Sequence, residues 1–247
     1  PLSAAIVAGA DLVISVGTRL TDFTTGSQSA FNHPDVRFIS LNVCGHDAYK
    51  QGALPVVADA REALRALIEG AQSAGIQPDS TYLERISEAS REWEKTLEGE
   101  VFVQHSGEAM SQGQVIGVLN EESRKGDVVI AAAGTPPGDL HKLWDVSRGA
   151  ACHLEFGYSC MGYELPAALG VRMSQPEGEV YALIGDGTYL MNPTELVTAV
   201  QEKLKITVVI SENHGFQSIH GLQIARAGCS FGSEFHHRDT TTNRLEG

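Results

Sequence analysis

The stretch VYALIGDGTYLM, residues 180–191, joins a run of apolar residues to a Gly-Asp-Gly turn. Residues 180–184 predict a buried strand, and Asp186 follows it at the carboxyl end. Open α/β sheets bind their ligands at the carboxyl ends of their strands. Because most Gly-Asp-Gly triplets are only turns, the role of this one depends on the residues that follow it.

A helix and a second strand follow the turn. Residues 192–203 predict the helix, with Asn192 as N-cap, Pro193 at the first helical position and Glu195 completing a capping box. Residues 206–210 predict the strand. One strand–helix–strand unit therefore places two strand ends next to each other.

The second strand is followed by another polar side chain. Asn213 lies 27 residues after Asp186 (213 − 186 = 27). Carboxylate and amide oxygens are ligands that Mg²⁺ prefers, and phosphate oxygens of a bound molecule can complete its octahedron. The carbonyl of Gly215 could serve as a third protein ligand, and the glycines around Asp186 let the backbone approach a diphosphate closely. The spacing thus predicts a clamp for a metal ion and a diphosphate, but it does not identify a reaction.

Strand and helix signals alternate along the chain, which predicts an α/β fold with two parallel-sheet units. In the first unit, strands are predicted at residues 11–16, 37–43 and 54–58, and a helix at 60–69. In the second unit, a strand is predicted at 127–133 and helices at 114–122 and 161–173. We expect residues 71–113 to be a linker that carries one exposed, charged helix. We also expect the chain to be a piece of a longer protein.

The composition limits the partners. A formal net charge of −13 argues against nucleic acid and against an anionic membrane surface, since both attract an excess of Lys and Arg. No stretch approaches the roughly 18 apolar residues that a membrane span needs. The four cysteines show no metal-like spacing, which is typical of reduced thiols in a cytoplasmic protein.

Further motifs resemble those of the thiamine diphosphate-dependent enzymes of the acetolactate synthase group. They are PGDLHKLW at residues 137–144, SCMG at 159–162 and LPAA at 165–168, together with the Gly-Asp-Gly and Asn pair. The resemblance implies thiamine diphosphate and Mg²⁺ as cofactors, with Asp186, Asn213 and Gly215 as metal ligands. It further implies cofactor contacts for His141, Ser159, Met161, Gly185, Gly187, Thr188 and Gly215.

Two of these residues also have simpler interpretations. His141 could be an ordinary histidine on a helix face, and Met161 could be a core residue, which is the common role of Met in an apolar helix. The resemblance implies instead that Met161 props the cofactor into a bent shape. His214 and His220 could face a substrate, although polar residues of a surface loop are the simpler interpretation. Cys160 has no neighbouring base that would make it a nucleophile.

A narrower resemblance rests on AAAG at residues 131–134 and on EFGYSCMGYE at 155–164. These segments are similar to the trihydroxycyclohexane-1,2-dione hydrolases of myo-inositol breakdown. That family implies hydrolysis of a C–C bond in a polyhydroxylated cyclic 1,2-diketone, yielding a 5-deoxy-glucuronate. It also implies a homo-oligomer with active sites between subunits. On this resemblance, residues 1–70 belong to a Rossmann-like middle domain and residues 114–247 to a diphosphate-binding domain.

In this superfamily, a Glu on a separate pyrimidine-binding domain activates the cofactor. We expect that Glu to lie outside this chain, so the 247 residues alone should be an inactive part of an enzyme. In the middle domain, Arg19 follows Gly17 where relatives meet a flavin, but LNV at 41–43 offers no carboxylate for a ribose, and we expect no flavin.

Two other functions stay open. One is a carboligase or decarboxylase of the acetolactate synthase type. The other is a non-catalytic module for nucleotide binding or assembly. A dehydrogenase is disfavoured, because no G-x-G-x-x-G follows a predicted strand.

Overall fold

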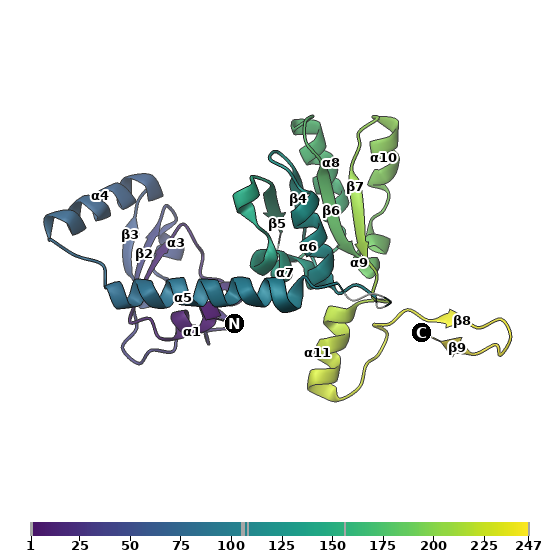
Figure 1. The fold of residues 1–247 in the computed structure, drawn as a ribbon, viewed down its shortest axis with the longest axis horizontal. Coiled ribbons are helices and arrows are strands. Elements are labelled where there is room, and N and C mark those ends of the chain that lie inside the picture. The colour runs from purple at the N-terminus through teal and green to yellow at the C-terminus, as the bar shows by residue number, and fades with distance from the viewer. Residues whose placement is uncertain (1, 105–106, 108, 156, 247) are drawn as a thin grey trace. The chain divides into compact units, whose positions relative to one another are not determined.

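The computed structural model describes residues 2–104, 107, 109–155 and 157–246 (Figure 1). The chain forms two compact units, residues 1–96 and 97–247. The boundary between them falls inside the segment that the sequence predicts as a linker. Among the described residues, no helix is long and apolar enough to cross a bilayer.

The first unit contains a three-stranded parallel sheet in the order β1-β2-β3. Its strands are β1 (Leu12–Val16), β2 (Arg37–Asn42) and β3 (Leu54–Val57), which confirms the three predicted strands. Its helices are α1 (Leu2–Ala8), α2 (Asp22–Thr25), α3 (Gly45–Ala48), α4 (Ala60–Ser73) and α5 (Ser80–Thr96), with a 3-10 turn at Lys50–Gly52. Asp59 caps α4 by accepting hydrogen bonds from the backbone N–H groups of Arg61 and Glu62. Because α4 continues to Ser73, the start of the predicted linker is helical.

The second unit contains a four-stranded parallel sheet in the order β5-β4-β6-β7. Its strands are β4 (Val128–Ala131), β5 (Ala151–Leu154), β6 (Val180–Gly185) and β7 (Thr207–Ser211). A π-helical turn (Leu97–Val101) and a 3-10 turn (Val146–Arg148) accompany helices α6 (Gln112–Glu122), α7 (Pro136–Leu143), α8 (Glu164–Ser174), α9 (Asp186–Met191), α10 (Glu195–Gln201) and α11 (Gln217–Ala227). A short hairpin pairs β8 (His237–Arg238) with β9 (Leu245–Glu246). The α/β class with parallel sheets is as predicted.

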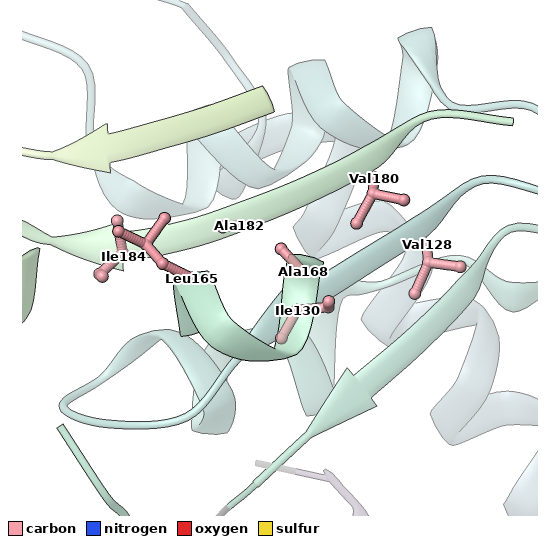
Figure 2. Packing of buried hydrophobic residues seen from close by; sticks show 7 residues of the cluster. All are labelled: Val128, Ile130, Leu165, Ala168, Val180, Ala182 and Ile184. Atoms are coloured by element: carbon pink, nitrogen blue, oxygen red, sulfur yellow. The ribbon is translucent and has the colours of Figure 1, made fainter. Parts of the chain in front are cut away.

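The core of the second unit lies between α8 and the two central strands. Figure 2 shows side chains of β4 and β6 together with Leu165 and Ala168 of α8. Leu165 lies beside Ile184 at one end of the cluster, while Val180 and Val128 lie at the other (Figure 2). Complete burial of one such aliphatic side chain contributes about 1.5–3 kcal/mol relative to exposure. This packing fixes the start of α8 near the carboxyl end of the sheet.

One predicted helix starts later than expected. The sequence predicts a helix from residue 161, whereas α8 begins at Glu164. Met161 and Gly162 form a turn before it, and Gly162 has φ of +87°, which an α-helix cannot accommodate. A Cβ at Gly162 would lie 2.8 Å from the Cβ of Asn192. The close contact with Asn192 thus requires glycine at position 162, and the backbone of Gly162 keeps α8 from starting earlier.

The predicted cap of the following helix is wrong. Asn192 has φ of −151° and is the C-cap of α9, a helix that the sequence analysis did not predict. Helix α10 starts at Glu195, and its N-cap, Thr194, makes no capping hydrogen bond through its side chain. Two effects explain the difference. Pro193 disfavours a helical backbone at the residue before it, and the amide of Asn192 donates to the carbonyl of Gly162 at 3.3 Å instead.

Candidate cofactor and metal site

Asp186 and Asn213 lie at the same edge of the second sheet. Strands β6 and β7 pair in parallel, with Gly185 opposite Ser211 in the last register position. Asp186 follows β6 directly, and Asn213 comes two residues after β7. The structure therefore brings together the carboxylate and the amide that the sequence spacing pairs.

Three polar groups meet at this edge. The side-chain amide nitrogen of Asn213 donates hydrogen bonds to Oδ1 of Asp186 at 3.2 Å and to the carbonyl oxygen of Gly215 at 2.9 Å. A half-turn of this amide would instead present its oxygen beside the other two. The three oxygens would then form a donor set that suits Mg²⁺.

The backbone around Asp186 holds its carboxylate in place. Oδ2 accepts a hydrogen bond from the N–H of Gly215 at 3.0 Å, and Oδ1 accepts one from the N–H of Gly187 at 2.8 Å. Thr188, in the first turn of α9, is buried. Asp186 is only partly buried, so its carboxylate is accessible to a ligand. Among the described residues, no cluster of three His, Cys, Asp or Glu side chains offers another metal site.

The glycines near Asp186 differ in whether the surrounding structure requires a residue without a Cβ. Gly215 has φ of +135°, and a Cβ there would overlap the carbonyl oxygen of Ser233. A Cβ at Gly187 would lie 2.8 Å from the ring of Phe216. At Gly185, by contrast, φ is −73° and a Cβ would meet nothing within 4 Å. The protein's own packing therefore requires glycine at 215 and 187 but leaves open space at 185.

The turn at residues 158–162 lies beside the end of β4. Oγ of Ser159 donates to the carbonyl of Ala132 at 3.5 Å, and Ser159 has φ of +54°. Glu155 accepts hydrogen bonds from the N–H groups of Tyr158 at 3.0 Å and Cys160 at 3.1 Å. The N–H of Cys160, then that of Tyr158, lowers the pKa of the Glu155 carboxyl. Phe156 lies outside the described residues.

The side chain of Met161 is 48% exposed, so Met161 is not a core residue in this chain. His141 lies near the end of α7 with its side chain exposed, after a different strand from the one that carries Asp186. His214 is exposed, with Nδ1 3.7 Å from Oε1 of Glu212, and His220 lies on α11 with Nδ1 3.7 Å from Oε2 of Glu234. The carboxylates that pair with His214 and His220 are not part of the Asp186–Asn213 pair.

Sequence reasoning missed two side chains of this region, Asn192 and Glu164. Asn192 lies at the end of α9 and contacts Gly162. Glu164 is fully buried, and its Oε1 accepts a hydrogen bond from the N–H of Ala133 at 3.1 Å. A glutamate at the start of an otherwise apolar helix was the available signal for Glu164. No local signal distinguishes Asn192 from an ordinary N-cap.

In the first unit, the buried amide of Asn42 lies at the end of β2. Its Nδ2 donates to the carbonyl of Thr18 at 3.0 Å, and its Oδ1 accepts from the N–H of Cys44 at 3.0 Å. Asn42 therefore joins the loops that follow β1 and β2. All four cysteines of the chain are free thiols.

Comparison with known protein families agrees with this geometry. Residues 132–243 match the C-terminal TPP binding domain of the thiamine pyrophosphate enzymes, and residues 1–67 match their central domain. Thiamine pyrophosphate is another name for thiamine diphosphate. The chain belongs to the thiamine pyrophosphate enzymes, as its motifs predict.

Individual relatives are more specific. The chain is similar to the 3D-(3,5/4)-trihydroxycyclohexane-1,2-dione hydrolase of Clostridium tetani, with 39% identity over 98% of the chain. It is 41% identical over 96% of its length to the Bacillus anthracis protein of the same name. The chain spans 41% and 40% of the lengths of these two relatives.

Proposed function

We propose that this chain forms the metal- and diphosphate-binding part of a thiamine diphosphate-dependent hydrolase. Its substrate would be a polyhydroxylated cyclic 1,2-diketone of inositol breakdown, whose ring C–C bond is cleaved. The observation that carries the cofactor role is the convergence of the Asp186 carboxylate, the Asn213 amide and the Gly215 carbonyl at one strand edge. The substrate class is taken from relatives about 40% identical over nearly the whole chain.

The clamp explains how an acidic chain can bind an anionic cofactor. With a formal charge of −13, the chain as a whole repels a diphosphate, so local groups must attract it. Asp186, Asn213 and the Gly215 carbonyl would hold Mg²⁺, and the metal would in turn hold the diphosphate. Gly185, Gly187, Thr188 and Gly215 would supply backbone that approaches the phosphate oxygens closely. The space beside Gly185 supports this, because no atom of the described residues lies within 4 Å of a Cβ built there.

The turn at residues 158–162 would support the rest of the cofactor. Thiamine diphosphate, when bound, supplies a nucleophilic carbon and an electron sink for cleavage of the bond beside a carbonyl. The chain's own residues bind and orient it. Ser159 and Met161 lie on a turn that Glu155 and Ala132 hold in place, and the half-exposed Met161 is available for contact with a ligand. His141 is proposed to lie near the diphosphate.

Assembly and location belong to the same proposal. We propose a homo-oligomer with active sites between subunits, as the resemblance to the acetolactate synthase group implies. The reduced cysteines support a cytoplasmic location.

The cofactor role is tested by calorimetric titration of the chain with thiamine diphosphate, with and without Mg²⁺. Asp186→Ala should weaken binding by about 100-fold or more, since loss of residues that merely orient metal ligands already costs about 10–100-fold. Asp35→Ala removes the same charge at an exposed site of the first unit and serves as the matched control. Absence of Mg²⁺-dependent binding by wild type, or equal binding by Asp186→Ala, would favour a non-catalytic module.

The substrate class needs a separate assay. The natural full-length protein, loaded with thiamine diphosphate and Mg²⁺, is offered the trihydroxylated cyclic 1,2-diketone and pyruvate in parallel. We expect ring opening of the diketone and little consumption of pyruvate. Faster consumption of pyruvate would replace the hydrolase with a carboligase or decarboxylase and leave the cofactor role intact.

A further inference from the structure

Glu164 carries a buried carboxyl group in the second unit. It is the first residue of α8, and its side chain is fully buried. Burying a polar group is unfavourable unless it forms hydrogen bonds. Oε1 accepts one from the N–H of Ala133, while Oε2 has no partner among the described residues. Because burial of this carboxyl is unfavourable for folding, its presence needs a specific explanation.

The location of the carboxyl supplies one. Ala133 belongs to the loop after β4, and the adjacent Ala132 accepts the hydrogen bond from Ser159. Glu164 itself comes two residues after the Met161–Gly162 turn. Its carboxyl therefore joins the end of β4 to the turn that carries two of the proposed cofactor residues, Ser159 and Met161.

The same turn is also joined to the metal clamp. Asn192 donates to the carbonyl of Gly162 at 3.3 Å, and it ends the short helix α9 that begins with Asp186. Two side chains thus connect the turn to its surroundings. Glu164, at the start of α8, bonds to the loop after β4, and Asn192, at the end of α9, bonds to Gly162. This network extends from the end of β4 through the turn to the first residue of α9.

The pKa of Glu164 reflects the burial of its carboxyl. Burial raises the pKa of its carboxyl, against the opposing effect of the backbone N–H groups of Glu164, Ala133, Ala132 and Gly162. Glu155, at the other end of the same segment, has a lowered pKa because backbone N–H groups at the surface stabilise its charge. The carboxyls at the two ends of the segment therefore have pKa shifts of opposite direction.

We infer that Glu164 is a positioning residue, which holds the Ser159–Met161 turn against the end of β4 so that the turn is preformed for the cofactor. Its hydrogen bond to Ala133 is the contact that does this. The inference rests on the proposed function for its link to thiamine diphosphate, but the holding of the turn can be tested without any cofactor.

The test compares three variants of the 247-residue chain. Glu164→Gln keeps the acceptor for the Ala133 N–H, and Glu164→Leu removes it at similar volume. Val180→Ala is the matched control, because it removes buried atoms of the second unit's hydrophobic cluster from the first residue of β6, at the far end from the turn. Residue-resolved amide hydrogen exchange reports on Ala133 and on residues 158–162. Calorimetry with thiamine diphosphate and Mg²⁺ reports on the cofactor.

We expect Glu164→Leu to accelerate exchange at Ala133 and in the turn, and to weaken cofactor binding by about 10-fold, as loss of supporting groups around a site typically does. Glu164→Gln should stay within about twofold of wild type in both measurements, since it keeps the hydrogen bond. Val180→Ala should lower overall stability without a selective change at the turn.

Two results would overturn the inference. One is equal exchange at Ala133 and the turn in Glu164→Leu and Val180→Ala. The other is unchanged cofactor binding in Glu164→Leu while its turn exchanges faster, because the turn would then not matter to the cofactor. Wild type without any cofactor binding would refute the proposed function and the link to the cofactor, while the exchange data would still decide whether Glu164 holds the turn.

Discussion

Replacing Gly215 by Ala should destabilise the second unit and disrupt the metal clamp. Gly215 has φ of +135°, a backbone conformation that L-residues rarely adopt. Its N–H donates to Asp186, and its carbonyl accepts from the side-chain amide of Asn213 at 2.9 Å. The residues on either side pair with the segment near Ser233, through Phe216 N–H to the Ser233 carbonyl at 2.7 Å and Phe235 N–H to the His214 carbonyl at 2.8 Å.

The magnitude follows from two effects. Holding a non-glycine residue in a glycine-only backbone region costs about 1–3 kcal/mol. The new Cβ would also overlap the Ser233 carbonyl and lie 3.0 Å from Cα of Glu234, so the segment at 233–234 must shift. Loss of one backbone hydrogen bond there adds about 0.5–1.5 kcal/mol. The total is roughly 2–4 kcal/mol, or a fall in melting temperature of roughly 4–16 °C for a unit of about 150 residues.

Gly185→Ala is the informative control. With φ of −73° and free space around the new Cβ, Ala should fit and stabilise the chain by about 0.4–1 kcal/mol. Its Cβ would occupy the space proposed for the diphosphate, so cofactor binding should fall although the fold is intact. Thermal unfolding followed by circular dichroism measures the first effect and calorimetry the second. A Gly215→Ala chain within about 0.5 kcal/mol of wild type, or a Gly185→Ala chain equally destabilised, would refute the reasoning.

Two further predictions concern pH and the segment at residues 155–164. The pKa of Glu164 is raised in the folded state, so the folded chain binds more protons than the unfolded chain between the two pKa values, and stability falls as pH rises through that window. Glu164→Gln lacks this dependence, so its stability relative to wild type should increase in denaturant titrations as pH rises above the unfolded-state pKa of the glutamate. Parallel curves would contradict a raised pKa for Glu164. The pKa of Glu155 is lowered by the N–H groups of Cys160 and Tyr158, so its contribution is present above the unfolded pKa and is lost as pH falls through the folded pKa. Glu155→Gln should show less acid sensitivity of amide exchange at Cys160 than wild type, and identical acid sensitivity would argue against the role of this carboxylate.

Much of the fold follows from local sequence patterns. The runs of β4 and β6 are continuously apolar because these strands are covered on both faces, and this burial makes them predictable. Strand β5 was missed, since its sequence ACHL contains a polar residue and its side chains are half exposed at the edge of the sheet. Helix α11 was also missed, because QSIHGLQIARA has an interior Gly and no strong apolar face.

Part of the candidate site could also be predicted from the sequence, and part could not. The pairing of Asp186 with Asn213 could be predicted, because a strand–helix–strand unit brings consecutive strand ends together whatever surrounds them. The holding of the Met161 turn by Glu164 and Asn192 could not. Each of these side chains reaches residues about 30 positions away in the sequence, and local propensity assigns both to helix ends.

The sequence by itself thus determined the class of fold, the family and the pairing of Asp186 with Asn213, since these depend on periodicity, on short motifs and on connections between neighbouring strands. Only the tertiary structure decided where α8 begins, why Gly215 and Gly162 must be glycine, and which buried acid supports the turn. Those features arise where three loops pack against one another at the end of the sheet. Close packing there fixes backbone angles and hydrogen-bond partners that no single segment specifies.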